Sequence, residues 1–187
     1  MKKLSVLLIG IFLLSLGCTK VQSYTKPDVD FSKINKIALI KLGSPDTFLS
    51  QVVTDQIALG FRQKGFNIIV KEQLKVLIDE NVVMQSGLTE SDRKALSLAG
   101  VDGVIVGTVR IRNFYEGRLV GGATSRQAFI GGKSTEKEKL ELSVKMFDTQ
   151  SGDVIWSANI HDLDSDELDE VGEGLAKSIK NKKKIEE

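Results

Sequence analysis

The sequence predicts a single α+β (α/β) domain, a mixed β-sheet of about five strands packed against three to four helices. Apolar runs bounded by turn residues alternate with apolar stripes of helical period, in the order strand–helix–strand–helix–helix–strand–strand–strand–helix. The chain has 187 residues, of which 41% are hydrophobic and 27% charged. This length and composition suit one hydrophobic core rather than two full domains.

The first half of the domain reads as two strands, each followed by a helix. A near-continuous apolar run at 36–42 predicts a buried strand, and a second strand is expected at 66–70. Between them an apolar stripe at helical spacing predicts a helix that closes at Lys64-Gly65. A shorter stripe made by Leu74, Leu77 and Ile78 predicts the next helix.

The second half predicts a helix, three strands and a last helix. Thr89 to Asp92 has the form of a capping box, and the helix it opens should end at Gly100. Strands are expected at 101–112, 140–146 and 154–160, the last two joined by a turn at Gln150-Ser151-Gly152-Asp153. The final helix carries the stripe Leu168, Val171, Leu175 and Ile179.

Charge and residue usage argue against several functional classes. Lys and Arg number 26 against 25 Asp and Glu, so no basic excess exists to hold nucleic acid. One histidine leaves little for acid–base or metal chemistry, and one cysteine allows neither an internal disulfide nor a zinc cluster. We therefore expect no enzyme, no metal and no cofactor.

The N-terminus reads as a signal peptide covering residues 1–17. Two lysines follow Met1, and residues 4–17 are uncharged and rich in Leu, Ile and Val. As a helix this stretch would rise about 21 Å, short of the roughly 30 Å of a bilayer core. It is therefore typical of the apolar region of a signal peptide rather than of a permanent span.

Cys18 is the expected lipid-attachment residue. The run Ser15-Leu16-Gly17-Cys18 resembles a bacterial lipobox, with Gly17 as the small residue before the cleavage site, although Ser15 departs from the usual Leu. Cleavage between Gly17 and Cys18 would leave a diacylglyceryl cysteine that also carries palmitate, and such acyl chains bind membranes stably. Thr19, the residue after the cysteine, favours sorting of the lipoprotein to the outer membrane. The alternative is ordinary signal cleavage that leaves a free thiol.

Residues 18–33 are expected to form the lipidated cysteine and a polar tether, and residues 34–183 the body. The stretch from Thr19 to Ser32 is polar and contains Pro27. Fully extended, it would reach at most about 50 Å. The body should therefore stay close to the membrane surface.

Five stretches in this order resemble the periplasmic domain of the curli-secretion lipoprotein (CsgG) and penicillin-binding-protein activator (LpoB) group. No single stretch is diagnostic, and the resemblance rests on their order and spacing over roughly residues 34–180. The stretches are Lys36–Ile40, Phe66–Leu74, Gln85–Thr89, Leu98–Val109 and Val144–Ser157.

The resemblance implies a non-catalytic, outer-membrane-anchored lipoprotein on the periplasmic side. It would act as an assembly or secretion accessory through contacts with envelope proteins, and copies of the chain would associate with one another. One alternative is a regulator that activates a cell-wall synthase, although the short tether argues against that role. Another is a lipoprotein displayed on the cell surface.

Residues 113–136 form a Gly-rich insertion with several readings. Gly132-Lys133-Ser134 resembles the end of a phosphate-binding loop, but Gln127 stands where that loop needs Gly, so no nucleotide is expected. The resemblance to the curli-secretion protein implies a hairpin that inserts into a membrane or lines a pore. The alternative is a mobile periplasmic hairpin or a loop that docks a partner protein. Tyr115, Leu119, Ala123 and Phe129 are the candidate contact residues.

The remaining polar clusters are expected to be structural. His161 with Asp162 and Asp164 reads as a solvated strand end rather than a metal site. The acidic residues from Asp164 to Glu170 suit a helix N-terminus, and Trp156 suits the core. Lys182 to Lys184 read as a solvated helix end.

Overall fold

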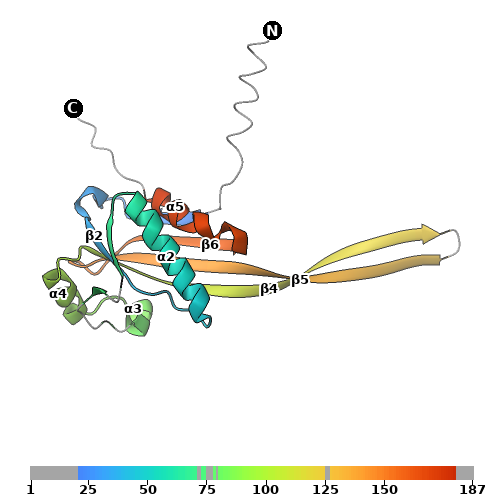
Figure 1. The fold of residues 1–187 in the computed structure, drawn as a ribbon, viewed down its shortest axis with the longest axis horizontal. Helices are drawn as coiled ribbons and strands as arrows, with labels where there is room; N and C mark the ends of the chain where they lie inside the picture. Colours follow the sequence, from blue (N-terminus) through green and yellow to red (C-terminus); the bar gives the residue numbers. More distant parts are fainter. Residues whose placement is uncertain (1–20, 71–72, 75–77, 79, 125–126, 180–187) are drawn as a thin grey trace, which may run out of the picture.

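A six-stranded mixed sheet forms the centre of the molecule (Figure 1). The computed structural model describes residues 21–70, 73–74, 78, 80–124 and 127–179. The sheet order is β1-β6-β5-β4-β2-β3; β2 is parallel to both of its neighbours and the other pairs are antiparallel. The strands are β1 (Val21–Thr25), β2 (Lys36–Leu39), β3 (Asn67–Val70), β4 (Gly103–Thr124), β5 (Gln127–Asp148) and β6 (Val154–Leu163). The expected single α+β domain is confirmed, with one more strand than the sequence predicts.

Four α-helices are present in the described part of the chain, and they cover the sheet unequally. α2 (Thr47–Gln63) and α5 (Leu168–Ser178) share the larger buried cluster, which spans strands β2 to β6. α3 (Glu80–Ser86) and α4 (Glu90–Leu98) contribute to a smaller cluster on the other face, over β2 and the start of β4. Two short 3₁₀ turns, η2 (Phe31–Lys33) and η4 (Ser165–Glu167), complete the described elements.

The two clusters explain why the strands differ in pattern. Ile37 and Leu39 of β2 belong to the larger cluster, whereas Ala38 and Ile40 belong to the smaller one. A strand buried on both faces is apolar on both, which explains the continuous apolar run at 37–40. Strand β5 buries only alternate residues on the α2 side before Phe147, which produces the period-two alternation at 140–146.

Local signals set the ends of the helices and the last turn. Asp46 accepts a hydrogen bond from the Leu49 amide at 3.0 Å and begins α2. Thr89 forms the expected capping box with Asp92. Gly100 and Gly152 have φ values of +68° and +79°, which L-residues with side chains rarely adopt, and they close α4 and the β5–β6 turn as predicted.

The expected tether is partly built into the fold. Val21–Thr25 is strand β1, which pairs with β6 at one edge of the sheet. Beyond it, the Lys26 amide donates to the Ile155 carbonyl at 2.9 Å, and Phe31 is buried in the larger cluster. The ordered body therefore begins by residue 21 and not at residue 34.

Two other elements differ from expectation. The helix expected around Leu74, Leu77 and Ile78 falls largely outside the described residues, and Leu74 and Ile78 themselves are not helical. Strand β6 runs three residues past Ile160, through a bulge at which Asp162 has a φ of +58°.

Candidate functional site

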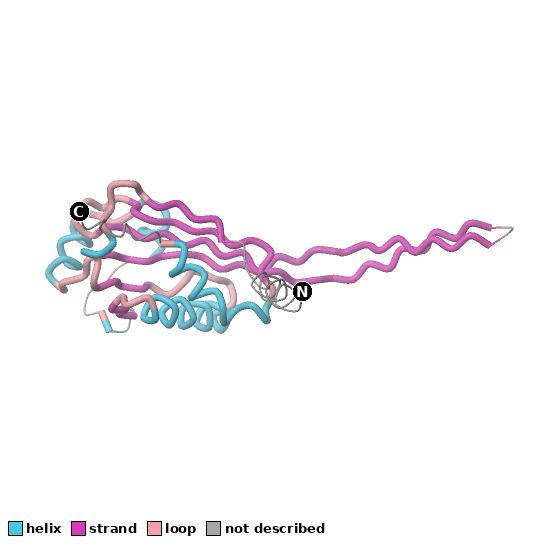
Figure 2. Tube along the Cα trace, turned by 90° about the horizontal axis from the view of Figure 1, so that it is seen from above, coloured by secondary structure: helices cyan, strands magenta, loops and turns pink. Residues whose placement is uncertain are grey.

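Strands β4 and β5 continue far beyond the rest of the sheet as a two-stranded ribbon (Figure 2). They pair without interruption from Gly103↔Asp148 to Thr124↔Gln127, whereas the β6 pairing ends at Leu140↔Leu163 and the β2 side ends at Gly43↔Thr108. We call residues 113–124 and 127–138 the ribbon. Each strand of it is about 40 Å long. The hairpin expected at 113–136 is therefore a direct extension of two central strands.

The register locates the four candidate contact residues within the ribbon. Tyr115, Leu119 and Ala123 recur at every fourth position of β4 and therefore share one alternating set. Phe129 pairs with Gly122 and falls in the other set. Their side chains lie outside what the structure describes, so the contact role of these residues stays a prediction.

The segment from Gly132 to Ser134 lies inside β5, opposite Gly117 to Leu119. A phosphate-binding loop instead leaves a strand and opens a helix, so that its backbone amides converge on the phosphates. This backbone is occupied in strand pairing.

Two ion pairs lie at the base of the ribbon. Arg112 Nη1 lies 2.9 Å from Glu141 Oε1 across the β4–β5 pair. On the β6 side, Lys139 donates to Asp164, and this hydrogen bond raises the pKa of Lys139 above its ordinary value, with Glu167 and Asp162 adding smaller contributions. Lys139 has a side chain only 17% exposed. The first pair therefore joins the two long strands to each other, and the second joins β5 to the segment that follows β6.

The remaining polar candidates have structural settings. His161 is exposed at the β6 bulge, and no group of residues suited to a metal ion occurs in the described part of the chain. Asp169 and Glu170 lie in the first turn of α5, as expected for acidic residues at a helix N-terminus. Trp156 is fully buried and donates its indole N–H to Ser178 Oγ at 3.1 Å, which confirms core packing.

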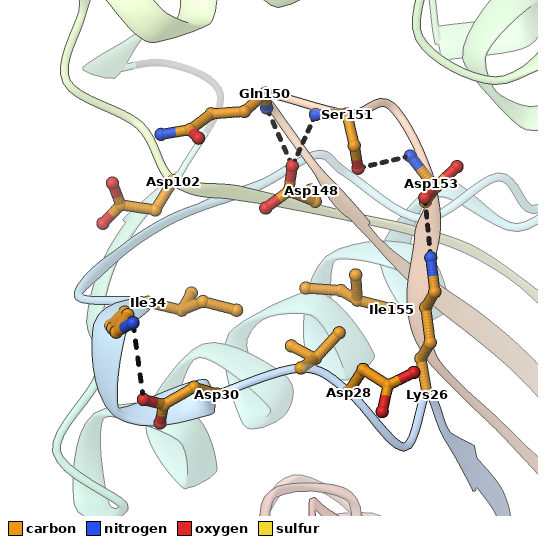
Figure 3. Close-up of a pocket in the computed structure, with 12 residues that line it drawn as sticks. Lys26, Asp28, Asp30, Ile34, Asp102, Asp148, Gln150, Ser151, Asp153 and Ile155 are labelled. Atoms are coloured by element: carbon orange, nitrogen blue, oxygen red, sulfur yellow. Dashed lines mark hydrogen bonds and ion pairs between the residues drawn. The ribbon is translucent and has the colours of Figure 1, made fainter.

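A cleft of about 460 Å³ opens at the end of the body opposite the ribbon (Figure 3). Five aspartates and two lysines contribute to its lining, among them Asp102, Asp148 and Asp153. Sequence reasoning missed this cleft because residues 26–34, which form one wall, read as a tether.

The carboxylates of this cleft are largely engaged by the protein itself. Asp148 Oδ1 accepts the Gln150 and Ser151 amides at 2.9 and 2.6 Å, and Asp102 Oδ2 accepts the Asn35 and Lys36 amides, each at 2.9 Å. Such contacts order the two adjoining turns. They account for these carboxylates without a bound cation.

An ion pair closes one side of the cleft. Lys26 Nζ lies 2.7 Å from Asp153 Oδ2, as Figure 3 shows. The hydrogen bond to Lys26 lowers the pKa of Asp153, and the same bond raises the pKa of Lys26. Both side chains are more than a third exposed, so solvent screens the interaction.

A second cleft, of about 520 Å³, lies at the base of the ribbon. It is lined by the segment that enters α2, including Pro45 and Asp46, and by Arg110, Ile111 and Glu138 of the two long strands. Ile111 is 45% exposed, and Phe48 in the first turn of α2 is 78% exposed. Two of the exposed large apolar residues of the described chain therefore lie at the end of the body from which the ribbon projects.

The expected signal-cleavage residue Gly17 and lipid-attachment residue Cys18 lie outside the described residues, as do Lys182 to Lys184. The nearest described element is β1, whose first residue, Val21, pairs with Ile160 at the ribbon end of the sheet. No helix in the described ranges is long and apolar enough to cross a membrane.

Comparison with known proteins shows likeness of architecture only. No model of a known protein family matches the chain, and no curated protein matches it significantly. Among solved structures it is similar to a PelC dodecamer from Paraburkholderia phytofirmans, at 15% identity and a TM-score of 0.48 over 84% of this chain and 94% of that one. It is also similar to the LpoB C-terminal domain from Salmonella enterica, at 13% identity and a TM-score of 0.40 over 84% of this chain and 93% of that one. A third neighbour is lipoprotein GNA1162 from Neisseria meningitidis, at 12% identity and a TM-score of 0.38 over 72% of this chain and 90% of that one. At these values the likenesses carry no inference about function.

Proposed function

We propose that this protein is a lipid-anchored protein of the bacterial outer membrane, facing the periplasm, and that it works by contact rather than by catalysis. In this role it is an accessory to assembly or secretion in the cell envelope. The acylated Cys18 anchors it in the membrane. The ribbon, together with the end of the body from which the ribbon projects, forms its contact surface.

The observation that carries this proposal is how soon the ordered body follows Cys18. Three residue steps separate Cys18 from Val21, where β1 begins. They span at most about 10 Å. A lipid on Cys18 would hold the ribbon end of the sheet at the membrane surface, which suits a protein that acts on partners in or at that membrane.

The geometry of the ribbon supports a contact role. A two-stranded hairpin is marginally stable in water, and the outer edges of both ribbon strands carry backbone groups that no described strand pairs. Partner strands or a protein surface would satisfy these groups. Envelope proteins and further copies of this chain are the partners we propose.

Regulation of a cell-wall synthase is the second candidate function. The resemblance of the sequence to the activator group favours it, whereas the short connection argues against it, since the body cannot leave the membrane to meet a distant enzyme. Display on the cell surface is compatible with the same anchor and differs only in the leaflet that carries the lipid.

The anchor is tested in intact cells with Cys18→Ala, and Thr19→Ala is the matched control. We expect Cys18→Ala to lose acyl label and to move from the membrane to the soluble fraction, while Thr19→Ala stays bound. Mass spectrometry of the mature amino end should find an acylated Cys18. An unmodified thiol at that position would overturn the proposal.

The contact role is tested by crosslinking in cells from a photoreactive residue at Tyr115 or Phe129. We expect adducts with an envelope protein or with a second copy of the chain, and native size in detergent separates these two results. Direct stimulation of a synthase by the purified protein would favour the regulatory alternative instead.

A further inference from the structure

Three exposed apolar residues lie at the ribbon end of the body, and we call them the base patch: Pro45, Phe48 and Ile111. Pro45 and Ile111 line the same cleft, and Phe48 follows in the first turn of α2. Phe48 is 78% exposed and Ile111 45%. Large apolar side chains grouped at one end of a domain mark a contact surface more often than scattered ones do.

The fold explains why this surface lacks a covering element. Val109 and Ile111 belong to the same alternating set of β4, yet Val109 is buried and Ile111 is not. The α2 layer, which covers Val109, begins only at Thr47, beside Asp46 in the cleft. The sheet therefore extends beyond its covering helices at this end, and Ile111 is exposed to solvent.

The chain N-terminal to the described residues leaves from this same end. Val21 pairs with Ile160, Ile160 with Leu142, and Leu142 with Val109, so all four lie on one row across the sheet, close to the ribbon. Cys18 lies within about 10 Å of Val21. A lipid on Cys18 would draw this row, and with it the base patch, to the bilayer.

We infer that the base patch contacts the surface of the bilayer in which the acyl chains of Cys18 are embedded. The inference rests on the proposed lipid anchor. Aromatic and aliphatic side chains are stable at the boundary between headgroups and acyl chains. Arg110, an exposed residue of the cleft lining, could pair with lipid phosphates there.

The length of the ribbon is compatible with this contact. A connection of about 10 Å cannot hold the body a whole ribbon length, about 40 Å, away from the membrane. Since the outer edges of its two strands have no described partner strand, the ribbon cannot enter the hydrocarbon alone and instead lies along the bilayer. In this arrangement the base of the ribbon meets the headgroups.

The charges at the ribbon end of the body predict which lipids the base patch can contact. The acidic residues Asp164, Asp166 and Glu167 follow β6 at the ribbon end, and Asp169 and Glu170 begin α5. They would be repelled by anionic lipid. Contact through the base patch should therefore occur on zwitterionic vesicles and should not require anionic lipid.

The test uses the full lipidated protein with a single new thiol. Cys18 is the only cysteine of the chain, and acylation caps it, so an environment-sensitive fluorophore labels only Phe48→Cys. The matched control is Leu98→Cys, since Leu98 is 83% exposed in the last turn of α4, at the opposite end of the body. Both proteins are reconstituted into phosphatidylethanolamine–phosphatidylcholine vesicles and floated on a gradient.

We expect both proteins to float with the vesicles. The fluorophore at position 48 should be blue-shifted and quenched by spin-labelled lipid at about 5–10 Å depth, and position 98 should show neither effect. Flotation with equal, water-like emission at both positions would overturn the inference while leaving the anchor intact. Failure to float, with fluorophore attached at Cys18, would overturn the proposed anchor and this inference with it.

Discussion

At the scale of single residues, two glycines set the distance between α2 and α5. A Cβ added at Gly172 would lie 1.8 Å from the Gln56 carbonyl oxygen, and one added at Gly60 would lie 2.0 Å from the Gly172 carbonyl carbon. No side-chain rotation relieves a clash with backbone. The two helices, which together cover the larger cluster, can be this close only while both positions lack a side chain.

Gly172→Ala should therefore destabilise the protein by about 1–3 kcal/mol, because the helices must separate. Gly174→Ala is the matched control in the same helix: its Cβ would meet Val21 Cγ2 at 3.4 Å, an ordinary contact. The control should be neutral or gain up to about 1 kcal/mol in helix propensity. Urea unfolding followed by the fluorescence of Trp156, which is fully buried, measures both. Equal stability of the two variants would contradict the close helix contact.

The Lys26–Asp153 pair predicts a pH dependence. The hydrogen bond from Lys26 lowers the pKa of Asp153 below its ordinary 3.8. A carboxyl group whose pKa is lower in the folded than in the unfolded protein stabilises the fold at pH values above its unfolded-state pKa. This contribution is lost as the pH falls through its folded-state pKa. In Lys26→Met, NMR titration should show the Asp153 pKa moving up towards its ordinary value. An unchanged Asp153 pKa would mean that the pair does not form in solution.

At the scale of elements, the ribbon should be separable from the fold. Every described member of the two buried clusters lies outside residues 113–138. We predict that replacing residues 114–137 with Asn-Gly leaves the unfolding midpoint unchanged, because Asn113 and Glu138 pair directly and a two-residue turn can join them. The same protein should lose the crosslinks to partners. A large fall in stability would show that the ribbon is part of the core.

The elements that sequence patterns predicted are those with a buried side. Each of these elements carries an apolar face or stripe whose period fits only one type of secondary structure. They are β2, α2, α4, the body part of β4 and β5, and α5. β1 carries no such signal, since Gln22, Ser23 and Tyr24 are all exposed on an edge strand. Pairing with β6 decides its conformation, and that pairing is not visible in a local window of sequence.

The candidate site was predictable in outline only. The position of the insertion at 113–136 followed from its glycines, and its hairpin form was implied only by the resemblance, with a docking loop as an alternative. The extent of the 22-residue strands β4 and β5 did not follow, because five glycines read as loop. The base patch was not predictable, since only the fold brings the first turn of α2 and Ile111 of β4 to the same end of the body. The Asp162 bulge likewise arises where the register of β5 and β6 shifts between Leu142↔Ile160 and Leu140↔Leu163.

At the scale of the whole molecule, the two ends of the sheet differ in character. One end holds the acidic cleft, whose carboxylates order the turns around Asp102 and Asp148. The other end holds the ribbon, the base patch and the start of β1. With Cys18 lipidated as proposed, the short connection would favour one orientation on a membrane, with the acidic cleft turned towards the aqueous phase.

This orientation should depend on the length of the connection and not on the lipid alone. Inserting 20 flexible Gly/Ser residues between Lys20 and Val21 would add roughly 25 Å of average reach. We predict that the protein stays in the membrane fraction, that lipid quenching at position 48 falls, and that contact with partners in the membrane is reduced. The same insert placed after Glu187 is the control and should change none of these. If both inserts leave partner contact intact, the ribbon alone sets the position of the body, and the distance between Cys18 and β1 has no role in function.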